Sequence, residues 1–333
     1  MDAYERLEKE FGEWIGNPNT VACNSGTAAL HLALEALELR PESRVIVPEF
    51  TMVACARAVT MAGLEPVFVD CDDTMLLDPV LVERRAAQRI KAIMPVHIYG
   101  RRCNMTAIHA TARYYDCRVV EDLAEAHGVR PHKDTDAACW SFYRNKIVAG
   151  EEGGMIAFKN PHHAKLAKKL RSQGFTAAHD FSHVPRGCNY RLANALASII
   201  LGSLHNVNEN LRRRTRIEAA YNRAIPEQYR LPKREACWVY DLRVPGMNAA
   251  QQSQIIANLN AAGVAARHAF KPMSSQQEYR KPHFHLKANL FAREVFYLPA
   301  DPTITEQQAA AIATMAAREI AAAVPSRTDA TAA

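Results

Sequence analysis

The sequence lacks the patterns that mark several common classes of protein. Its 333 residues include no CxxC pair and no HExxH motif, and the eight cysteines are scattered from Cys23 to Cys237 without the spacing of a zinc site. No uninterrupted apolar run reaches the roughly 18–20 residues that span a bilayer. The charged, amphipathic N-terminus is unlike a secretory signal. We therefore expect a cytoplasmic protein with free thiols, and no disulfide framework, metal site or membrane anchor.

The excess of positive charge is small. The formal net charge is +6, from 41 Lys and Arg against 35 Asp and Glu, which suits an anionic substrate without requiring one. The densest basic run, Arg212-Arg213-Arg214, lies in a helical pattern. A solvated helix face is therefore favoured there over a nucleic-acid patch.

Strand-like and helix-like segments alternate through the first half of the chain. Such alternation predicts a mainly parallel sheet covered by helices on both faces. The expected strands are 43–50, 65–70, 90–99 and 118–123, and the expected helices are 1–16, 26–37, 51–63 and 105–115.

The pattern changes after the stretch GGMIAF (153–158). Helices are expected to fill about 160–225, followed by a strand at 238–244, a helix at 251–263 and a last helix near 305–323. We therefore predict a large domain over residues 1–215 and a smaller α+β domain over 216–324. The low-complexity end, 325–333, is expected to be a disordered tail.

Two short features of the large domain suit a phosphorylated cofactor. Asn24-Ser25-Gly26-Thr27 opens a helix, where small residues expose backbone N–H groups to a phosphate, although the same stretch fits an ordinary N-cap. Asp122 follows an apolar run, at the strand end where α/β sheets place ligands. Alone, Asp122 would equally suit a cap of the next helix.

The third feature is Lys146, which stands between two apolar runs in CWSFYRNKIVAGEEGGMIAF (139–158). Because burying an ammonium is costly, this lysine lies either on an exposed loop or in a desolvated setting kept for chemistry. The three features together match the needs of pyridoxal phosphate (PLP). A neutral lysine forms a Schiff base with the cofactor aldehyde, and an aspartate keeps the pyridine nitrogen protonated.

With these motifs, the chain resembles the DegT/DnrJ/EryC1/StrS family of PLP-dependent sugar aminotransferases. The resemblance covers nearly the whole chain and implies the fold-type-I architecture, a large domain with a mainly parallel central sheet and a smaller C-terminal α+β domain. The stretches that carry it include NSGTAALHLAL (24–34), VIVPEFTMVACARAV (45–59), MPVHIYGRRCNM (94–105), VVEDLAEAHG (119–128), SFYRNK (141–146), GEEGGMIAF (150–158) and RGCNYRLANALASIILGSL (186–204).

The resemblance implies a role for each matching residue. Lys146 is expected to form the Schiff base and carry protons, and Asp122 to pair with the pyridine nitrogen. Glu125 stands where the family often has glutamine, near the phenolic oxygen, and Met52 where a side chain covers the ring. The expected phosphate contacts are Gly26, Thr27, Ser141 and, from the partner chain of a homodimer, Asn189.

The chain also departs from the family pattern. Besides Glu125, the turn at 150–154 has an extra acid. The chain starts only about three and a half helical turns before WIGNPNT (14–20), whereas family members usually carry a further N-terminal segment that helps build the acceptor pocket. We therefore expect a more open acceptor side.

The resemblance implies a homodimeric aminotransferase that moves an amino group from glutamate or glutamine to a keto group of an anionic, nucleotide-linked sugar. Arg191, Arg267 and Lys271, with His268, are candidate anchors for that anion, because arginine binds carboxylates and phosphates in a bidentate way. The alternative is that each is a solvated surface charge. For Asn189 and Arg191, an ordinary helix entry is also compatible.

Two other functions stay open at this stage. One is a PLP-dependent decarboxylase or lyase that acts on an amino-acid-derived adduct of a nucleotide or nucleic acid, although nucleic acid is not the favoured partner. The other is a non-catalytic regulatory or binding protein on the same fold. The presence of Lys146 argues against this last function and against the family's dehydratase branch, in which histidine replaces the lysine.

Overall fold

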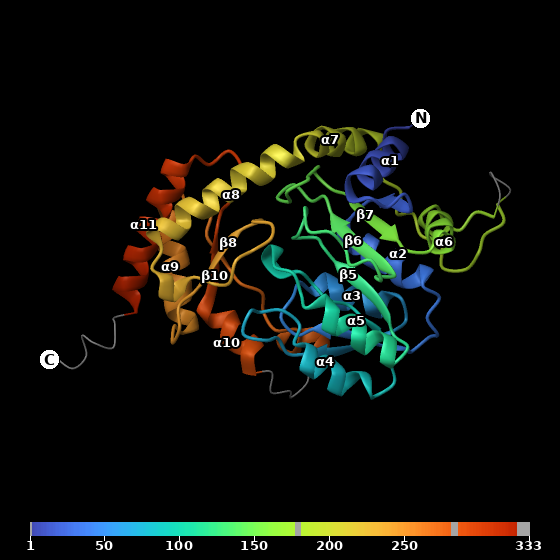
Figure 1. Ribbon diagram of the computed structural model, residues 1–333, viewed down its shortest axis with the longest axis horizontal. Helices are drawn as coiled ribbons and strands as arrows, with labels where there is room; N and C mark the ends of the chain where they lie inside the picture. Colours follow the sequence, from blue (N-terminus) through green and yellow to red (C-terminus); the bar gives the residue numbers. More distant parts are fainter. Residues whose placement is uncertain (1, 177–180, 281–285, 325–333) are drawn as a thin grey trace.

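The computed structural model describes residues 2–176, 181–280 and 286–324. The predicted tail, 325–333, lies outside the described residues. A large α/β unit holds the first helices and the central sheet, and a smaller unit contains α9 (Ala249–Ala261), α10 (Leu286–Glu294) and α11 (Glu306–Ala323) (Figure 1). Among the described residues, no helix is both long enough and apolar enough to cross a membrane.

The large unit is built on a seven-stranded sheet with the order β1-β7-β6-β5-β4-β2-β3. All strands run parallel except β7, which is antiparallel to both β6 and β1. This confirms the predicted α/β fold with a mainly parallel sheet. The strands are β1 (Thr20–Cys23), β2 (Arg44–Pro48), β3 (Glu65–Val69), β4 (Ile90–Ile93), β5 (Arg118–Asp122), β6 (Ala137–Ser141) and β7 (Gly154–Phe158).

Polar side chains set where several helices of this unit begin. Ser25 caps α2 by accepting a hydrogen bond from the Ala28 N–H at 3.1 Å, and Asn104 caps α5 in the same way. The helices are α1 (Ala3–Ile15), α2 (Gly26–Ala36), α3 (Val53–Met61), α4 (Pro79–Ala86), α5 (Met105–Tyr114), α6 (Pro161–Arg171) and α7 (Asn194–His205).

Two predicted segments are wrong in extent. The strand expected over 90–99 ends at Ile93, since a proline, Pro95, follows and the chain turns into the short 3-10 helix η1 (Ile98–Gly100). The helices expected to fill 160–225 are interrupted between α6 and α7. There Gly174 adopts a φ of +73°, a conformation that ends a helix.

The smaller unit has a three-stranded antiparallel sheet of order β8-β10-β9, against which helices pack. The predicted strand at 238–244 and the two predicted helices are confirmed within a few residues, whereas β9, β10 and α10 were not expected. The elements are α8 (Val207–Ala224), η2 (Glu227–Tyr229), β8 (Tyr240–Arg243), α9 (Ala249–Ala261), β9 (Arg267–His268), η3 (Met273–Ser275), η4 (Gln277–Tyr279), α10 (Leu286–Glu294), β10 (Val295–Leu298) and α11 (Glu306–Ala323).

Helix α8 connects the two hydrophobic cores of the molecule. Its first residue, Val207, is buried in the core of the large unit, whereas Ile217 and Tyr221 belong to the second core. The helix runs from α7 toward α11 in Figure 1. The predicted boundary between 215 and 216 therefore falls inside a continuous helix.

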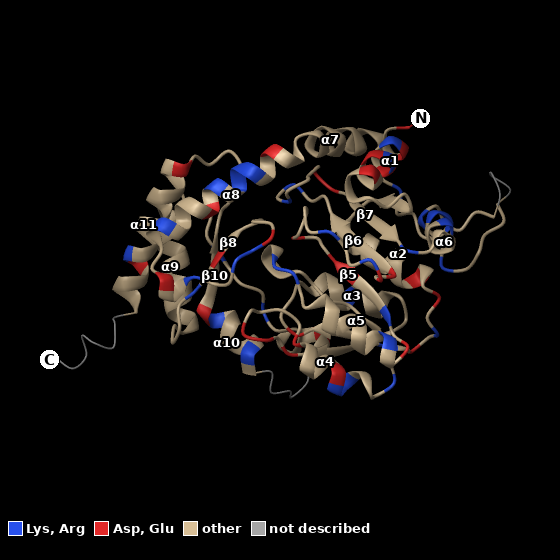
Figure 2. Ribbon diagram, in the orientation of Figure 1, with Lys and Arg blue, Asp and Glu red and all other residues tan. Residues whose placement is uncertain are grey.

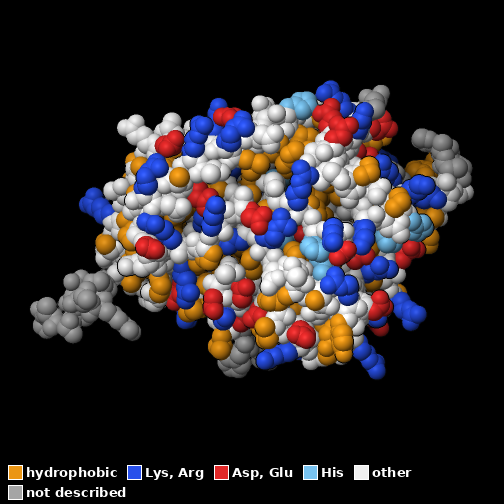
Figure 3. Space-filling view, in the orientation of Figure 1, with side chains coloured by type: hydrophobic (Ala, Val, Ile, Leu, Met, Phe, Trp, Pro, Cys, Tyr) orange, Lys and Arg blue, Asp and Glu red, His pale blue; other side chains and the backbone are white. Residues whose placement is uncertain are grey.

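Charge is spread unevenly over the helices. Helix α8 carries several basic turns, whereas α7 has no Lys, Arg, Asp or Glu (Figure 2). On the face seen in Figure 3, basic and acidic side chains are interspersed. Arg212 and Arg213 fit the predicted solvated helix face, because both pair with Glu209 on the same helix. The prediction is wrong for Arg214, which is buried and donates a hydrogen bond to the Trp238 carbonyl at 2.7 Å.

Candidate active site

A cavity of about 500 Å³ opens at the carboxyl ends of β5 and β6. The large unit contributes the first turns of α2 and α3, and the smaller unit contributes Trp238, Phe270 and Tyr297. The cavity brings together seven of the residues singled out from the sequence. They are Gly26, Thr27, Met52, Asp122, Glu125, Ser141 and Lys146.

The N-terminus of α2 and the end of β6 form a narrow cradle. A Cβ added at Gly26 would lie 2.7 Å from the Ser141 Cβ and 3.0 Å from its Oγ, so a side chain at position 26 would collide with the neighbouring strand. The first N–H groups of a helix have no intrahelical acceptor. Gly26, Thr27 and Ser141 therefore present backbone and hydroxyl groups suited to an anion.

Asp122 ends β5 with its side chain buried at the base of the cavity. Oδ1 accepts a hydrogen bond from the Ala124 N–H at 2.9 Å, and Oδ2 accepts one from the Cys55 thiol at 3.2 Å. Burial raises the pKa of Asp122 above its ordinary value, although these two donors and the Lys146 charge oppose the rise. The Asp122 carboxylate therefore makes the local contact expected of a helix cap, through the Ala124 N–H. It also lines the cavity.

Lys146 lies in the loop after β6 and borders the cavity. Its Nζ is 3.7 Å from the centroid of the Trp238 ring, a distance at which an ammonium is attracted to the ring face. Burial lowers the pKa of Lys146, while the charges of Glu125 and Asp122 oppose that change. The lysine is therefore in a desolvated setting, which increases its neutral, nucleophilic fraction.

Glu125 faces Lys146 inside the same cavity. Its Oε2 accepts a hydrogen bond from the Tyr99 N–H at 2.8 Å. Burial raises the pKa of Glu125 to about 7, against the opposing effects of the Lys146 charge and the Tyr99 N–H. Near neutral pH the carboxyl group is therefore present in both its protonated and its ionised form.

An aromatic wall closes the cavity on the side of the smaller unit, and the sequence reasoning missed it. The Trp238 indole N–H donates a hydrogen bond to the Asn145 carbonyl at 2.7 Å, directly beside Lys146. Tyr99 stacks on Phe270 with ring centroids 5.3 Å apart. These side chains come from loops, from η1 and, for Tyr297, from the central strand of the smaller sheet, and no local motif marks them. A further lining residue, Glu152, was flagged only as an acid of the unusual turn.

Five predicted site residues do not line the cavity of the single chain: Asn189, Arg191, Arg267, His268 and Lys271. Asn189 and Arg191 are exposed in the segment that precedes α7 and are not among the described residues that line the cavity. Arg267 is exposed and pairs in the sheet with Tyr297, a lining residue. Lys271 is exposed directly after Phe270. Arg267 and Lys271 therefore lie near the cavity without entering it.

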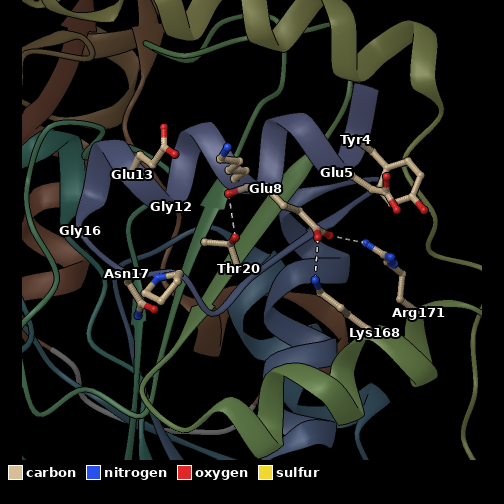
Figure 4. A pocket seen from close by; sticks show the side chains of 12 residues that line it. Tyr4, Glu5, Glu8, Gly12, Glu13, Gly16, Asn17, Thr20, Lys168 and Arg171 are labelled. Atoms are coloured by element: carbon tan, nitrogen blue, oxygen red, sulfur yellow. Dashed lines mark hydrogen bonds and ion pairs between the residues drawn. The ribbon is translucent and has the colours of Figure 1, made fainter. Parts of the chain in front are cut away.

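A larger hollow, of about 850 Å³, lies against α1 and α6, away from Lys146 (Figure 4). Its central carboxylate, Glu8, is paired with Lys168 at 2.8 Å and Arg171 at 2.7 Å. Glu8 also accepts a hydrogen bond from the Ala22 N–H. This carboxylate is therefore neutralised by the protein itself and connects α1, β1 and α6, whereas the smaller cavity contains the reactive groups.

Comparison with known proteins decides the family. Residues 2–316 match the DegT/DnrJ/EryC1/StrS aminotransferase family. The chain belongs to this family. Because the match spans nearly the whole chain, it confirms the resemblance inferred from the motifs and the assignment as an aminotransferase. It does not favour the lyase or the non-catalytic alternative.

Several relatives within the DegT/DnrJ/EryC1/StrS family have curated names. The chain is 38% identical to a GDP-perosamine synthase of Caulobacter vibrioides, over 82% of this chain and 77% of the relative. It is 32% identical to a UDP-N-acetyl-3-dehydro-alpha-D-glucosamine 3-aminotransferase of Acidithiobacillus ferrooxidans, over 94% and 88% of the two chains. Both relatives are named for nucleotide-linked sugars.

Solved structures of family members have the same fold. DesV of S. venezuelae superposes with a TM-score of 0.87 at 28% identity, over 96% of this chain and 90% of that one. The PLP form of a putative sugar aminotransferase of Streptococcus pneumoniae superposes with a TM-score of 0.89 at 25% identity, over 97% and 92%. These similarities confirm the predicted fold of PLP-dependent aminotransferases.

Proposed function

We propose that this family member uses PLP to transfer an amino group from an amino acid, glutamate or glutamine, to the keto group of a nucleotide-linked sugar. The observation that supports the proposal most directly is the meeting of Lys146, Asp122 and the Gly26–Ser141 cradle in one cavity. The names of relatives that act on GDP-, UDP- and dTDP-linked sugars support the substrate class.

The residues of the cavity fit PLP. The cradle that a Cβ at Gly26 would fill suits the phosphate, and the desolvated Lys146 suits the aldehyde. Asp122 is a buried carboxylate held by neutral donors, so a protonated ring nitrogen would supply the missing positive charge. When bound, PLP supplies an electrophilic carbon for amines and a ring that accepts the electrons of a breaking C–H bond.

Each side chain around the cavity has a separate role in such a transfer. Lys146 moves protons at its Nζ, because its lowered pKa leaves a neutral fraction that accepts a proton and an ammonium that returns it. Asp122 would hold the ring N–H of PLP with its carboxylate. Glu125 faces the same space and offers a carboxyl group that is protonated in part near neutral pH. Trp238 holds the lysine amine over its ring face.

The proposal includes a homodimer with shared sites in the cytoplasm. Asn189 is exposed near the entry to α7, and α7 has no Lys, Arg, Asp or Glu and exposes Ile199 by 52%. Met52, which lines the cavity, is 53% exposed. A second chain placed against these surfaces would cover apolar area. The eight cysteines are free, which fits a reducing compartment.

The cofactor and its attachment point are tested together. The purified protein should be yellow, and borohydride reduction should fix the pyridoxyl group on Lys146, as shown by peptide mass spectrometry. Lys146→Ala should lose the colour, whereas the control Lys165→Ala, at an exposed position of α6, should keep it. Addition of the true amino donor should convert the absorbance to that of the amine form. A pyridoxyl group on any other lysine would refute the assignment.

The anionic acceptor is tested by charge reversal near the cavity. Arg267→Glu and Lys271→Glu should raise the KM for a nucleotide-linked keto-sugar while leaving the visible spectrum of the bound cofactor unchanged. Arg84→Glu, at an exposed position of α4, is the control and should leave the KM unchanged. If uncharged small ketones were the best acceptors and these variants behaved like wild type, the acceptor class would be wrong.

A further inference from the structure

We propose that Cys55 is a positioning residue for the amino-transfer reaction, which orients the Asp122 carboxylate toward the ring nitrogen of the cofactor. This inference rests on the proposed function. It adds a contact between α3 and β5 that no motif of the sequence indicated.

The contact lies in the first turn of α3, where the helix meets the end of β5. The side chain of Cys55 is fully buried, and its Sγ lies 3.2 Å from the Asp122 Oδ2. The other oxygen of Asp122 accepts from the Ala124 N–H at 2.9 Å. A carboxylate held at both oxygens by donors from different elements has its plane fixed, so it cannot rotate away from the cavity.

The direction of the hydrogen bond follows from the chemistry of the groups. An ionised carboxylate only accepts, so the Cys55 S–H must donate to Asp122. The Thr51 Oγ1 lies 3.4 Å from the same sulfur, and its hydroxyl is then the donor in that contact. The Thr51 hydroxyl thus donates to the Cys55 sulfur, and the Cys55 S–H donates to the Asp122 carboxylate. Burial and the Asp122 charge raise the pKa of the Cys55 thiol, which keeps the proton on the sulfur.

An apolar side chain at position 55 would leave Asp122 less constrained. Removal of the thiol donor would leave Oδ2 in a buried site without this partner, which disfavours the ionised carboxylate. Asp122 would then bind a protonated ring less tightly. A purely structural role for Cys55 would instead depend on the volume of the side chain and would be independent of Asp122.

The test separates the two roles through the affinity for PLP. The dissociation constant is measured on cofactor-free protein, by the visible absorbance of the complex, for wild type, Cys55→Ser and Cys55→Ala. Serine keeps a donor of similar size, so its constant should stay within about twofold of wild type, whereas alanine should raise it about tenfold. Cys71→Ala is the matched control, because Cys71 is another buried thiol of the large unit, and it should leave the constant unchanged.

The same substitutions in an Asp122→Asn chain decide whether the effect passes through Asp122. There Cys55→Ala should change the constant by less than about twofold, because the ionised acceptor is gone. The inference would be overturned if Cys55→Ala still weakened PLP binding tenfold in the Asp122→Asn chain. It would also be overturned if Cys55→Ser and Cys55→Ala weakened PLP binding equally in the wild-type chain. Wild-type affinity in Cys55→Ala would overturn it as well. Failure of the wild-type chain to bind PLP would instead refute the proposed function, and this inference with it.

Discussion

At the scale of single residues, the site depends on the surroundings of Lys146. A lysine amine in a protein interior is disfavoured in its charged form, and here the nearby carboxylates of Glu125 and Asp122 and the face of Trp238 offset part of that cost. The carboxylates stabilise the ammonium while burial favours the neutral amine. The net lowering of the pKa of Lys146 increases the fraction of neutral amine, the form in which a proton carrier accepts a proton.

Glu125→Gln should change the pH dependence of stability. Because the pKa of Glu125 is raised to about 7 in the folded protein from about 4.3 when unfolded, the folded state binds an extra proton between these values. The contribution of Glu125 to the free energy of unfolding of wild type therefore falls by roughly 3 kcal/mol as pH rises from about 4 to 7. Glutamine cannot titrate and does not have this loss. The variant should gain stability relative to wild type as pH rises through this range.

Chemical unfolding of the cofactor-free proteins at pH 4, 5.5, 7 and 8 would measure this difference. Glu151→Gln, at an exposed position of the turn after Lys146, is the control and should show no such trend. A difference between Glu125→Gln and wild type that is the same at all four pH values would contradict the raised pKa.

At the scale of elements, the start of α2 and the end of β6 have to approach closely for the cradle to form. Gly26 permits that approach, and Ser25 fixes the start of the helix through its contact with Ala28. The sequence pattern indicated the helix start, and the approach to β6 explains why a glycine stands there.

Gly26→Ala should weaken cofactor binding while leaving the fold intact. The added Cβ would lie 2.7 Å from the Ser141 Cβ, so α2 or β6 must shift and the phosphate contacts widen. We expect the dissociation constant for PLP to rise at least about tenfold, equivalent to about 1.4 kcal/mol. Equilibrium dialysis against PLP, with circular dichroism as the check on folding, would measure it.

Gly12→Ala is the matched control for this substitution. Gly12 lies in helix α1 and outside the lining of the cavity, and a Cβ there would lie 2.7 Å from the Asn17 carbonyl oxygen. The crowding is similar but does not involve the cradle, so this variant should keep the affinity for PLP. Tight binding by the Gly26→Ala protein would show that the cradle does not hold the phosphate.

At the scale of the whole molecule, a buried charge cluster joins the two cores. Arg101, which follows η1 of the large unit, makes two hydrogen bonds to Asp241 of β8, at 2.8 and 3.1 Å. Arg234 pairs with the same carboxylate and with Glu218 of α8. The cluster fixes the aromatic wall of the smaller unit relative to the strand ends, and thereby the shape of the cavity.

Asp241→Asn should destabilise the protein by about 3–5 kcal/mol, because Arg101 and Arg234 would stay buried with an incomplete partner. Burial raises the pKa of Asp241, but the two guanidinium charges outweigh it and hold the pKa below its ordinary value. The stabilisation is therefore fully present above the unfolded pKa of about 3.9 and is lost as pH falls through the lower folded value.

Urea unfolding midpoints between pH 3 and pH 8 would show this behaviour. The difference in urea midpoint between wild type and Asp241→Asn should stay constant from pH 5 to pH 8 and become smaller only below about pH 4. The control is Glu235→Gln, which breaks the exposed pair of Arg102 and Glu235 and should cost less than about 1 kcal/mol. If Asp241→Asn and Glu235→Gln lowered the free energy of unfolding equally, the proposed role of the buried charge cluster would be contradicted.

The proposed homodimer with shared sites predicts complementation between two inactive variants. Lys146→Ala and Asn189→Ala chains should each be impaired, and Asn189→Ala should bind PLP more weakly. After random exchange of chains, an equal mixture should recover about a quarter of wild-type activity, since half of the dimers are mixed and each keeps one intact site. Activity assays before and after exchange, with mixed dimers verified by mass spectrometry, would measure it. Verified mixed dimers without recovered activity would rule out a shared site.

The sequence by itself determined the features that depend on local pattern. The alternation of strands and helices indicated the α/β fold, because residues that form a strand or a helix differ in hydrophobic period. The motifs around Gly26, Asp122 and Lys146 indicated a PLP site, and the family resemblance that they carry implied further cavity residues such as Met52 and Glu125. The family followed from the same motifs.

Only the tertiary structure decided which distant side chains meet around these residues. Trp238, Phe270 and Tyr297 enter the cavity from the smaller unit, and Cys55 reaches Asp122 across the contact between α3 and β5. No periodic pattern marks such pairs, because their positions depend on how separate elements pack. The raised pKa of Glu125 belongs to the same class of property. Its cause is burial, which the whole fold sets and no single segment of sequence specifies.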